Sequence, residues 1–71
     1  GVPDQSLLQG QALYRLGRYQ EALELLRCAE VQATPEEAPP IWQLLEACCR
    51  ESGDYRGAYE YAAKLRPPAG P

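Results

Sequence analysis

The chain has 71 residues, enough for one domain that buries about 60% of the surface exposed by its unfolded form. Hydrophobic residues make up 45% and charged residues 24%, a balance that argues against disorder, and no apolar run approaches the roughly 20 residues of a membrane span. The net charge is -3 and the basic residues are scattered, so neither nucleic acid nor an anionic membrane is expected as a partner.

The first predicted helix follows Pro3 and has Asp4 as its N-cap. Its apolar residues recur at helical spacing: Leu7, Leu8, Ala12, Leu13 and Leu16. Gly17 ends it, because helices often end on a residue with positive φ, which glycine adopts at the lowest cost. A second helix is predicted from Arg18 to Ala33. Its buried face is expected to hold Tyr19, Ala22, Leu23, Leu26 and Ala29, with Val31 as a further candidate.

A polar connector, Thr34–Pro40, contains three prolines, and Pro39 and Pro40 suit the start of the next helix. The third helix is predicted over 41–52. Its apolar residues are Ile41, Trp42, Leu44, Leu45, Cys48 and Cys49. Glu46 and Arg50 stand four apart in this helix, in the order that favours a surface ion pair.

Gly53 ends the third helix as Gly17 ends the first, and Asp54 caps a fourth helix that Pro67 and Pro68 terminate. Turns of a few residues between four helices imply antiparallel neighbours. The predicted fold is therefore all-α: two stacked helix-turn-helix hairpins, 4–35 and 36–68, in a single domain with a tail at 69–71.

The two halves repeat each other at a spacing of 36 residues, as LGRYQEALE (16–24) and SGDYRGAYE (52–60) show. Such self-similarity is typical of stacked helical hairpins. Tyr19 and Tyr55 are expected to pack a ring against the first helix of their own hairpin. Ala22 and Ala58 follow about one turn later, where a bulky side chain would force two closely crossing helices apart.

This pattern resembles the tetratricopeptide repeat (TPR). The first half matches through Gly10, Gly17, Tyr19, Ala22, Leu26 and Ala29, and the second through Trp42, Leu45, Gly53, Asp54, Tyr55 and Ala58. Ser6 and Gln9 depart from the Trp and Leu of that pattern, and Glu46 and Leu65 depart from its small residues. The spacing of 36 also exceeds the usual value of about 34.

The resemblance implies a non-catalytic protein–protein interaction module, a scaffold or adaptor. Stacked hairpins form a curved layer whose concave side is lined by the first helix of each pair, and TPR proteins hold a partner's peptide or helix there. The 36-residue shift pairs the candidate partner-binding residues as Leu7 with Gln43, Gln11 with Ala47, and Tyr14 with Arg50. An equally weighted alternative is that Leu7 and Tyr14 complete the core. Leu7, Gln11 and Leu44 replace the Lys and Asn clamp for chaperone C-termini, so that activity is not expected.

A second hypothesis is self-association, or packing against the rest of a larger protein. Two hairpins leave two open ends, and at least three repeats are normally needed for a stable array. Tyr55 is expected to be internal, whereas Tyr59 and Tyr61 are two apart and cannot both face the same core. Tyr59, Tyr61 and Leu65 are the candidates for this contact; the alternative is that these tyrosines lie flat with the hydroxyl in water.

Residue types that carry chemistry are scarce. The chain lacks histidine, the commonest general base and metal ligand, and Glu36 and Glu37 stand in the proline-rich connector, where we interpret them as solvated. We therefore expect no enzymatic activity and no cofactor.

The three cysteines are Cys28, Cys48 and Cys49. The last two are adjacent in a helix, about 100° apart around its axis, and form a poor bridge. Three thiols without histidine fall short of a zinc site, so no metal is predicted. Reduced packing thiols are favoured over a Cys28 bridge or an intermolecular disulfide, which indicates an intracellular protein, cytoplasmic or nuclear. The start at Gly1, without a signal peptide, suggests a piece of a longer protein.

Overall fold

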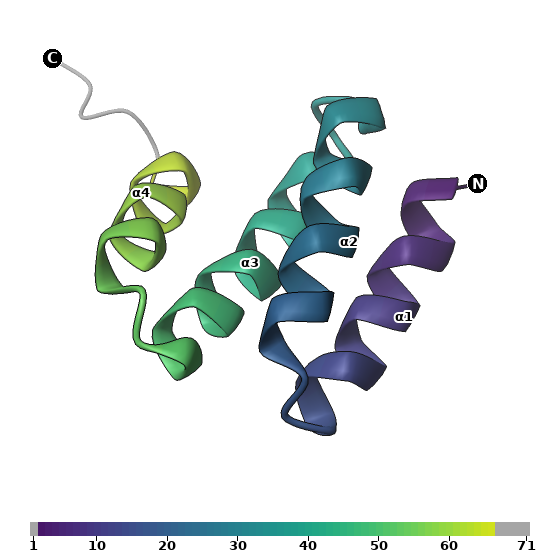
Figure 1. The fold of residues 1–71 in the computed structure, drawn as a ribbon. Coiled ribbons are helices and arrows are strands. Elements are labelled where there is room, and N and C mark those ends of the chain that lie inside the picture. Colours follow the sequence, from purple (N-terminus) through teal and green to yellow (C-terminus); the bar gives the residue numbers. More distant parts are fainter. Residues whose placement is uncertain (1, 67–71) are drawn as a thin grey trace, which may run out of the picture.

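The structure, a computed structural model, describes residues 2–66, and this range holds four α-helices and no strand. The helices are α1 (Val2–Arg15), α2 (Tyr19–Gln32), α3 (Ala38–Ser52) and α4 (Tyr55–Leu65). Consecutive helices run antiparallel, and the four lie in a row from α1 at one end to α4 at the other (Figure 1). The predicted all-α class is confirmed. Pro67, Pro68 and the tail at 69–71 lie outside the described residues.

Both hairpin turns use the same backbone device. Gly17 (φ 79°) and Gly53 (φ 91°) are the residues with positive φ within the described range. In the first turn Gly17 N donates to Tyr14 O at 3.0 Å and Arg18 N donates to Leu13 O at 2.9 Å. This pair of bonds is the Schellman arrangement, which satisfies the last carbonyls of a helix.

The second turn repeats both bonds. Gly53 N donates to Arg50 O at 3.2 Å and Asp54 N donates to Cys49 O at 2.8 Å. The prediction that a glycine reverses the chain at each of these two positions is confirmed.

The predicted start of α1 is wrong by three residues, since an N-cap at Asp4 would make Gln5 the first helical residue. The helix begins at Val2, so Asp4 lies inside its first turn and is not its N-cap. An acidic residue in the first turn still faces the exposed N–H groups of a helix start, which is why the sequence signal pointed to this region. In α4 the predicted cap is confirmed, because Asp54 Oδ1 accepts from Gly57 N at 3.1 Å.

The connector is shorter than Thr34–Pro40, because α3 begins at Ala38. Pro39 and Pro40 therefore occupy the first turn of α3. Backbone N–H groups of a first turn have no acceptor within the helix, so the missing N–H of proline removes no helical hydrogen bond. Thr34 and Glu37 close the connector: Thr34 N donates to Glu37 Oε1 at 2.9 Å, and Glu37 N donates to Thr34 Oγ1 at 3.3 Å. Such a reciprocal pair is a capping box.

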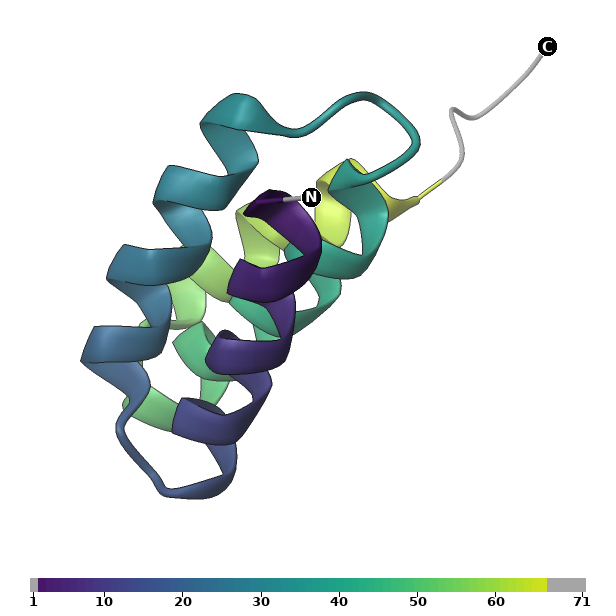
Figure 2. The same ribbon diagram turned by 90° about the vertical axis from the view of Figure 1, so that its right-hand side faces the viewer.

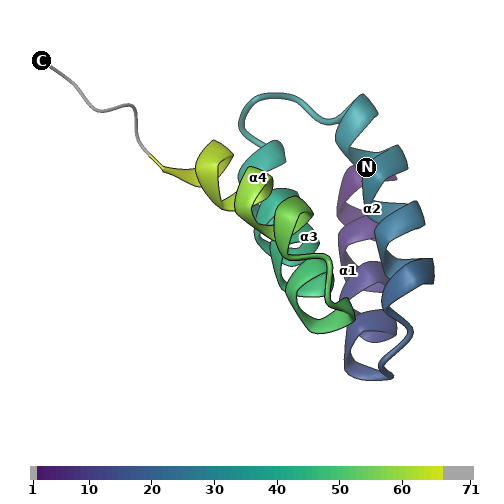
Figure 3. The same cartoon turned by 60° about the vertical axis from the view of Figure 1, so that its left-hand side comes forward.

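The two hairpins, α1–α2 and α3–α4, stack with α2 against α3, and α1 also touches α3 (Figure 3). Seen from the α1 end, α1 stands in front of the second hairpin (Figure 2). One core joins both hairpins. Its buried residues are Ala22, Leu23, Leu26, Ala29, Ile41, Leu45, Cys48, Cys49 and Ala58.

Small residues lie where helices cross, as predicted. Ala22 is fully buried and Ala58 is 7% exposed. Gly10 of α1 is also buried, and a Cβ added there would lie 2.8 Å from Leu26 Cδ2. The first hairpin therefore packs too closely at this point for any side chain on Gly10.

Several apolar residues expected in the core are exposed. Leu8, Leu16 and Val31 expose 67%, 70% and 86% of their surface, and Ala12 is exposed as well. Leu8 and Ala12 belong to α1 and Val31 to α2, helices that each bury only part of their surface, and Leu16 lies in the turn after α1.

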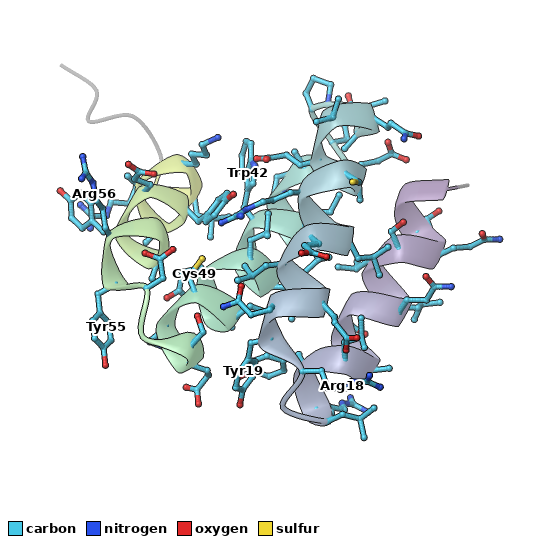
Figure 4. The ribbon with its side chains drawn as sticks, in the orientation of Figure 1. Arg18, Tyr19, Trp42, Cys49, Tyr55 and Arg56 are labelled. Atoms are coloured by element: carbon cyan, nitrogen blue, oxygen red, sulfur yellow. The ribbon has the colours of Figure 1, made fainter. Side chains whose placement is uncertain are left out.

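The expected burial of Tyr55 is also wrong. Tyr55 is 71% exposed and points away from the helices (Figure 4). Its counterpart Tyr19 is half-buried, and the Tyr19 ring packs on that of Tyr14 in α1 at 5.7 Å between centroids. The prediction of a ring against the hairpin's own first helix is thus confirmed for Tyr19 only.

Candidate functional site: two exposed surfaces and a junction cluster

The first candidate surface lies on α1 and α3, which touch each other directly. Gln11, Gln43 and Arg50 are exposed there, and Ala47 is half-buried. These four residues are called the first-helix surface below.

Leu7 and Tyr14 are half-buried and pack against the hydrophobic core. For these two of the six predicted partner-binding residues, the structure places the side chain in the core, as the alternative interpretation held.

Arg50 carries the expected ion pair. Its Nη1 donates to both carboxylate oxygens of Glu46, at 2.7 Å and 3.0 Å. The Arg50 side chain is 53% exposed, and exposed pairs of this kind contribute at most about 1 kcal/mol. The guanidinium therefore remains open to an incoming carboxylate, although Glu46 offsets part of its charge.

A polar cluster that sequence reasoning missed lies where α2, α3 and α4 meet. Trp42 Nε1 of α3 donates to Glu30 Oε2 of α2 at 2.5 Å, and Lys64 Nζ of α4 lies 3.5 Å from the same oxygen. The Lys64 ammonium also lies over two rings, 5.5 Å from the Trp42 centroid and 5.7 Å from that of Tyr61. Glu30, Trp42, Tyr61 and Lys64 form the junction cluster, of which Trp42 is labelled in Figure 4.

Arg27 extends the cluster along α2. A side-chain hydrogen bond with Tyr61 raises the pKa of Arg27, and burial opposes this in part. Because Arg27 and Glu30 belong to the first hairpin and Tyr61 and Lys64 to the second, the cluster ties the hairpins together over α3. The one available signal was Trp42 itself, because an indole N–H that leaves water usually finds an acceptor.

The cysteines divide into two kinds. Cys48 and Cys49 are fully buried, and burial raises the pKa of the Cys48 thiol to about 11. Burial, and then the nearby Asp54 carboxylate, also raise the pKa of Cys49. Cys28 is exposed, and all three thiols are free. Cys48 and Cys49 therefore act as small packing residues, whereas Cys28 does not.

The remaining candidates lie on α4. Tyr59 is 65% exposed, with the Arg66 guanidinium 5.8 Å from its ring centroid. Tyr61 and Leu65 are half-buried, and Tyr61 packs against the core. The exposed aromatic pair on α4 is thus Tyr55 and Tyr59.

Within residues 2–66 no group of His, Cys, Asp and Glu side chains is arranged to hold a metal ion, and no pocket is found. No helix of this range has the length and apolar character needed to cross a membrane.

Comparison with protein-family models, curated proteins and solved structures finds no match for the chain. The resemblance to the TPR family stays a prediction.

Proposed function

We propose that the chain is a non-catalytic module of the TPR type that binds a partner polypeptide on the first-helix surface. The observation that carries the proposal is the direct contact of α1 with α3, which have exposed Gln11 and Gln43 side chains. A layer of neighbouring first helices with exposed polar side chains is the part of a helical-hairpin stack that suits an extended ligand.

The chemistry of the surface favours a peptide backbone. A glutamine amide offers two donor hydrogens and an acceptor oxygen, which match the N–H and C=O groups of an extended chain. Arg50 adds a fork of donors that suits a carboxylate, either from a side chain or from a chain terminus. We therefore infer a ligand that is an extended peptide with at least one carboxylate.

A library of random linear 12-residue peptides, displayed on phage, supplies the probe. We expect Gln11→Ala and Gln43→Ala each to weaken binding of a selected peptide by about 2- to 12-fold, the value of one net hydrogen bond. Gln20→Ala is the matched control, because Gln20 is an exposed glutamine of α2 outside the surface. Isothermal titration calorimetry gives the affinities.

Two results would contradict the proposal. One is a set of selected peptides whose affinity neither glutamine variant changes. The other is a map of NMR amide shifts on peptide addition that centres on α2 or α4 instead of the region around Gln11 and Gln43.

A further inference from the structure

Two helix sides form the contact between the hairpins, one on α2 and one on α3, and separate observations identify each of them. On α2, Leu23, Leu26 and Glu30 are spaced three and four apart and so share one side of the helix. Glu30 holds Trp42 of α3, which marks this side as the one toward the second hairpin. Leu23 and Leu26 are buried, at 3% and 0% exposure, and Leu26 also packs against α1, where a Cβ added at Gly10 would lie 2.8 Å from its Cδ2.

On α3 the matching side holds Ile41, Leu45 and Cys48, all buried. Cys49 lies about 100° further around the helix and faces α4, because a Cβ added at Gly57 of α4 would lie 3.1 Å from its Sγ. Ile41, Leu45 and Cys48 are therefore turned toward the first hairpin.

A shift of 36 residues relates the α2 face to a set of residues on α4, and the α3 face to a set of residues on α1. Both of these sets lie at the ends of the molecule. Tyr19 stands four residues before Leu23 and so shares this side of α2, while its ring also packs on Tyr14 of α1. Tyr19, Leu23 and Leu26 correspond to Tyr55, Tyr59 and Ala62 of α4, which we call the trailing face.

Ser52 continues the spacing of Ile41, Leu45 and Cys48 along α3, and the half-buried Leu44 borders this side and packs against the core. These five residues correspond to Gln5, Leu8, Gln9 and Ala12 of α1 and to Leu16 in the turn that follows it, which together are the leading face. Whereas the inner faces are largely buried, all five residues of the leading face are exposed.

Exposed apolar surface is concentrated on these two faces. Within the described residues the large hydrophobic side chains that are exposed are Leu8, Leu16, Val31, Tyr55 and Tyr59. Four of these five lie on the leading or the trailing face, and Val31 alone lies elsewhere. Scattered single exposures are ordinary on a protein surface, but grouping on two opposite ends indicates contact sites.

We propose that the trailing face of one copy of this chain packs on the leading face of a second copy, in the way that α2 packs on α3 within one copy. The second copy is the indicated occupant because each end face corresponds to one half of an interface that the molecule already forms. α1 and α4 lie at opposite ends of the row of helices, so one copy can use both faces at once (Figure 1).

The contact is heterologous, since different surfaces meet, and it does not close on itself. Association therefore continues past the dimer as concentration rises. It is weaker than the internal contact, because Gln5 and Gln9 stand where α3 has Ile41 and Leu45. The proposal goes beyond the proposed function: Gln11 and Gln43 belong to neither end face, so peptide binding and self-association can fail independently.

Light scattering after size-exclusion chromatography, from micromolar to millimolar concentration, tests the proposal. The wild-type mass is expected to rise from the monomer value of 7.9 kDa past twice that value. Tyr59→Lys places a charge in the trailing face, and Leu8→Lys places one in the leading face. Each substitution blocks one half of the contact, so each variant alone is expected to stay monomeric. Val31→Lys is the control, with an equally exposed apolar residue outside both faces, and is expected to associate as the wild type does.

Mixing the two variants is the decisive arm. Tyr59→Lys retains an intact leading face and Leu8→Lys an intact trailing face, so an equimolar mixture is expected to reach the dimer mass and stop there. Circular dichroism of each variant verifies that the helices are intact. A wild type that stays monomeric, a mixture that stays monomeric, or loss of association in Val31→Lys would each overturn the proposal.

Discussion

At the scale of single residues, Gly53 gives the sharpest test of how the chain reverses. Its φ is 91°, and a Cβ built on it meets no other atom within 4 Å. A side chain there would therefore be penalised by backbone conformation alone. We expect Gly53→Ala to lower the free energy of unfolding by about 1–2 kcal/mol.

A synthetic chain with D-alanine at position 53 is the matched control, because a D-residue favours positive φ. It should retain or slightly exceed the wild-type stability, since it also restricts the unfolded chain. Urea unfolding followed by circular dichroism measures both. Equal stability of the L- and D-alanine chains would contradict the role assigned to the turn.

Cys48 makes stability depend on pH above neutrality. Burial raises its pKa from the ordinary value of 9.0 to about 11 in the folded chain. The folded state thus binds the thiol proton more tightly, so this contribution is complete below the unfolded pKa and is lost as pH rises toward the folded one. We expect a loss of the order of 1–2 kcal/mol between about pH 8 and about pH 10.

Urea unfolding at the two pH values measures this loss, and Cys48→Ala separates this thiol from the neighbouring Cys49, whose pKa is also raised. The alanine variant is less stable throughout because it leaves a small cavity, but its stability should fall less between the two pH values. A parallel fall in both proteins would rule the thiol out as the cause.

At the scale of helices, the two hairpins differ in how the second helix starts. Asp54 caps α4 through its bond to Gly57 N, whereas the side chain of its counterpart Arg18 makes no capping bond at the start of α2. We expect Asp54→Ala to cost about 1 kcal/mol, the usual value of an N-cap. Arg18→Ala removes only an exposed pair with Glu21 and should cost less than about 0.5 kcal/mol.

Thermal unfolding of the two variants makes the comparison, since each replaces the residue just before its helix with alanine. If both lost the same amount of stability, the capping bond would not be the source of the difference. Asp54→Asn, which retains an acceptor oxygen, should recover most of the loss.

The turns and the helix cap that depend on local sequence signals were predicted from the sequence. Features that depend on residues far apart in the chain were missed. Positive φ at Gly17 and Gly53 and the cap at Asp54 act within a few residues, so these were predicted correctly. The start of α3 was placed too late because Pro39 and Pro40 are equally compatible with the last connector residues and the first helical turn. The Thr34 and Glu37 pair, spaced as a capping box requires, signals that the chain begins to coil before the prolines, although α3 itself begins only at Ala38.

Burial at the ends of the row was harder to predict. The repeat made Tyr55 look equivalent to Tyr19, but a residue is buried only where a neighbour covers it, and the second hairpin covers the first without being covered in turn. The periodic pattern in α1 likewise could not separate Leu8 and Leu16 from inner residues. Lys64 and Glu30 are 34 positions apart, so nothing in the order of residues joined them.

At the scale of the whole molecule, the relative placement of the hairpins depends on the junction cluster. The Glu30 carboxylate is its centre: it accepts from the Trp42 indole and lies beside the Lys64 ammonium. The two contacts are not equivalent. Trp42 is half-buried and its bond to Glu30 is partly buried, whereas the Lys64 side chain is 49% exposed. The indole bond should therefore contribute more to stability.

We expect Glu30→Ala to lower the free energy of unfolding by about 1–3 kcal/mol, because it leaves the partly buried indole N–H of Trp42 without its acceptor. Glu30→Gln retains an acceptor oxygen for Trp42 and loses only the charge beside Lys64, so its cost should be under about 1 kcal/mol, as for Lys64→Ala. Tryptophan fluorescence reports urea unfolding in all three, because Trp42 is the single tryptophan of the chain. If Glu30→Gln lowered the free energy of unfolding as much as Glu30→Ala does, the ion pair with Lys64, and not the indole bond, would be what holds the hairpins in place.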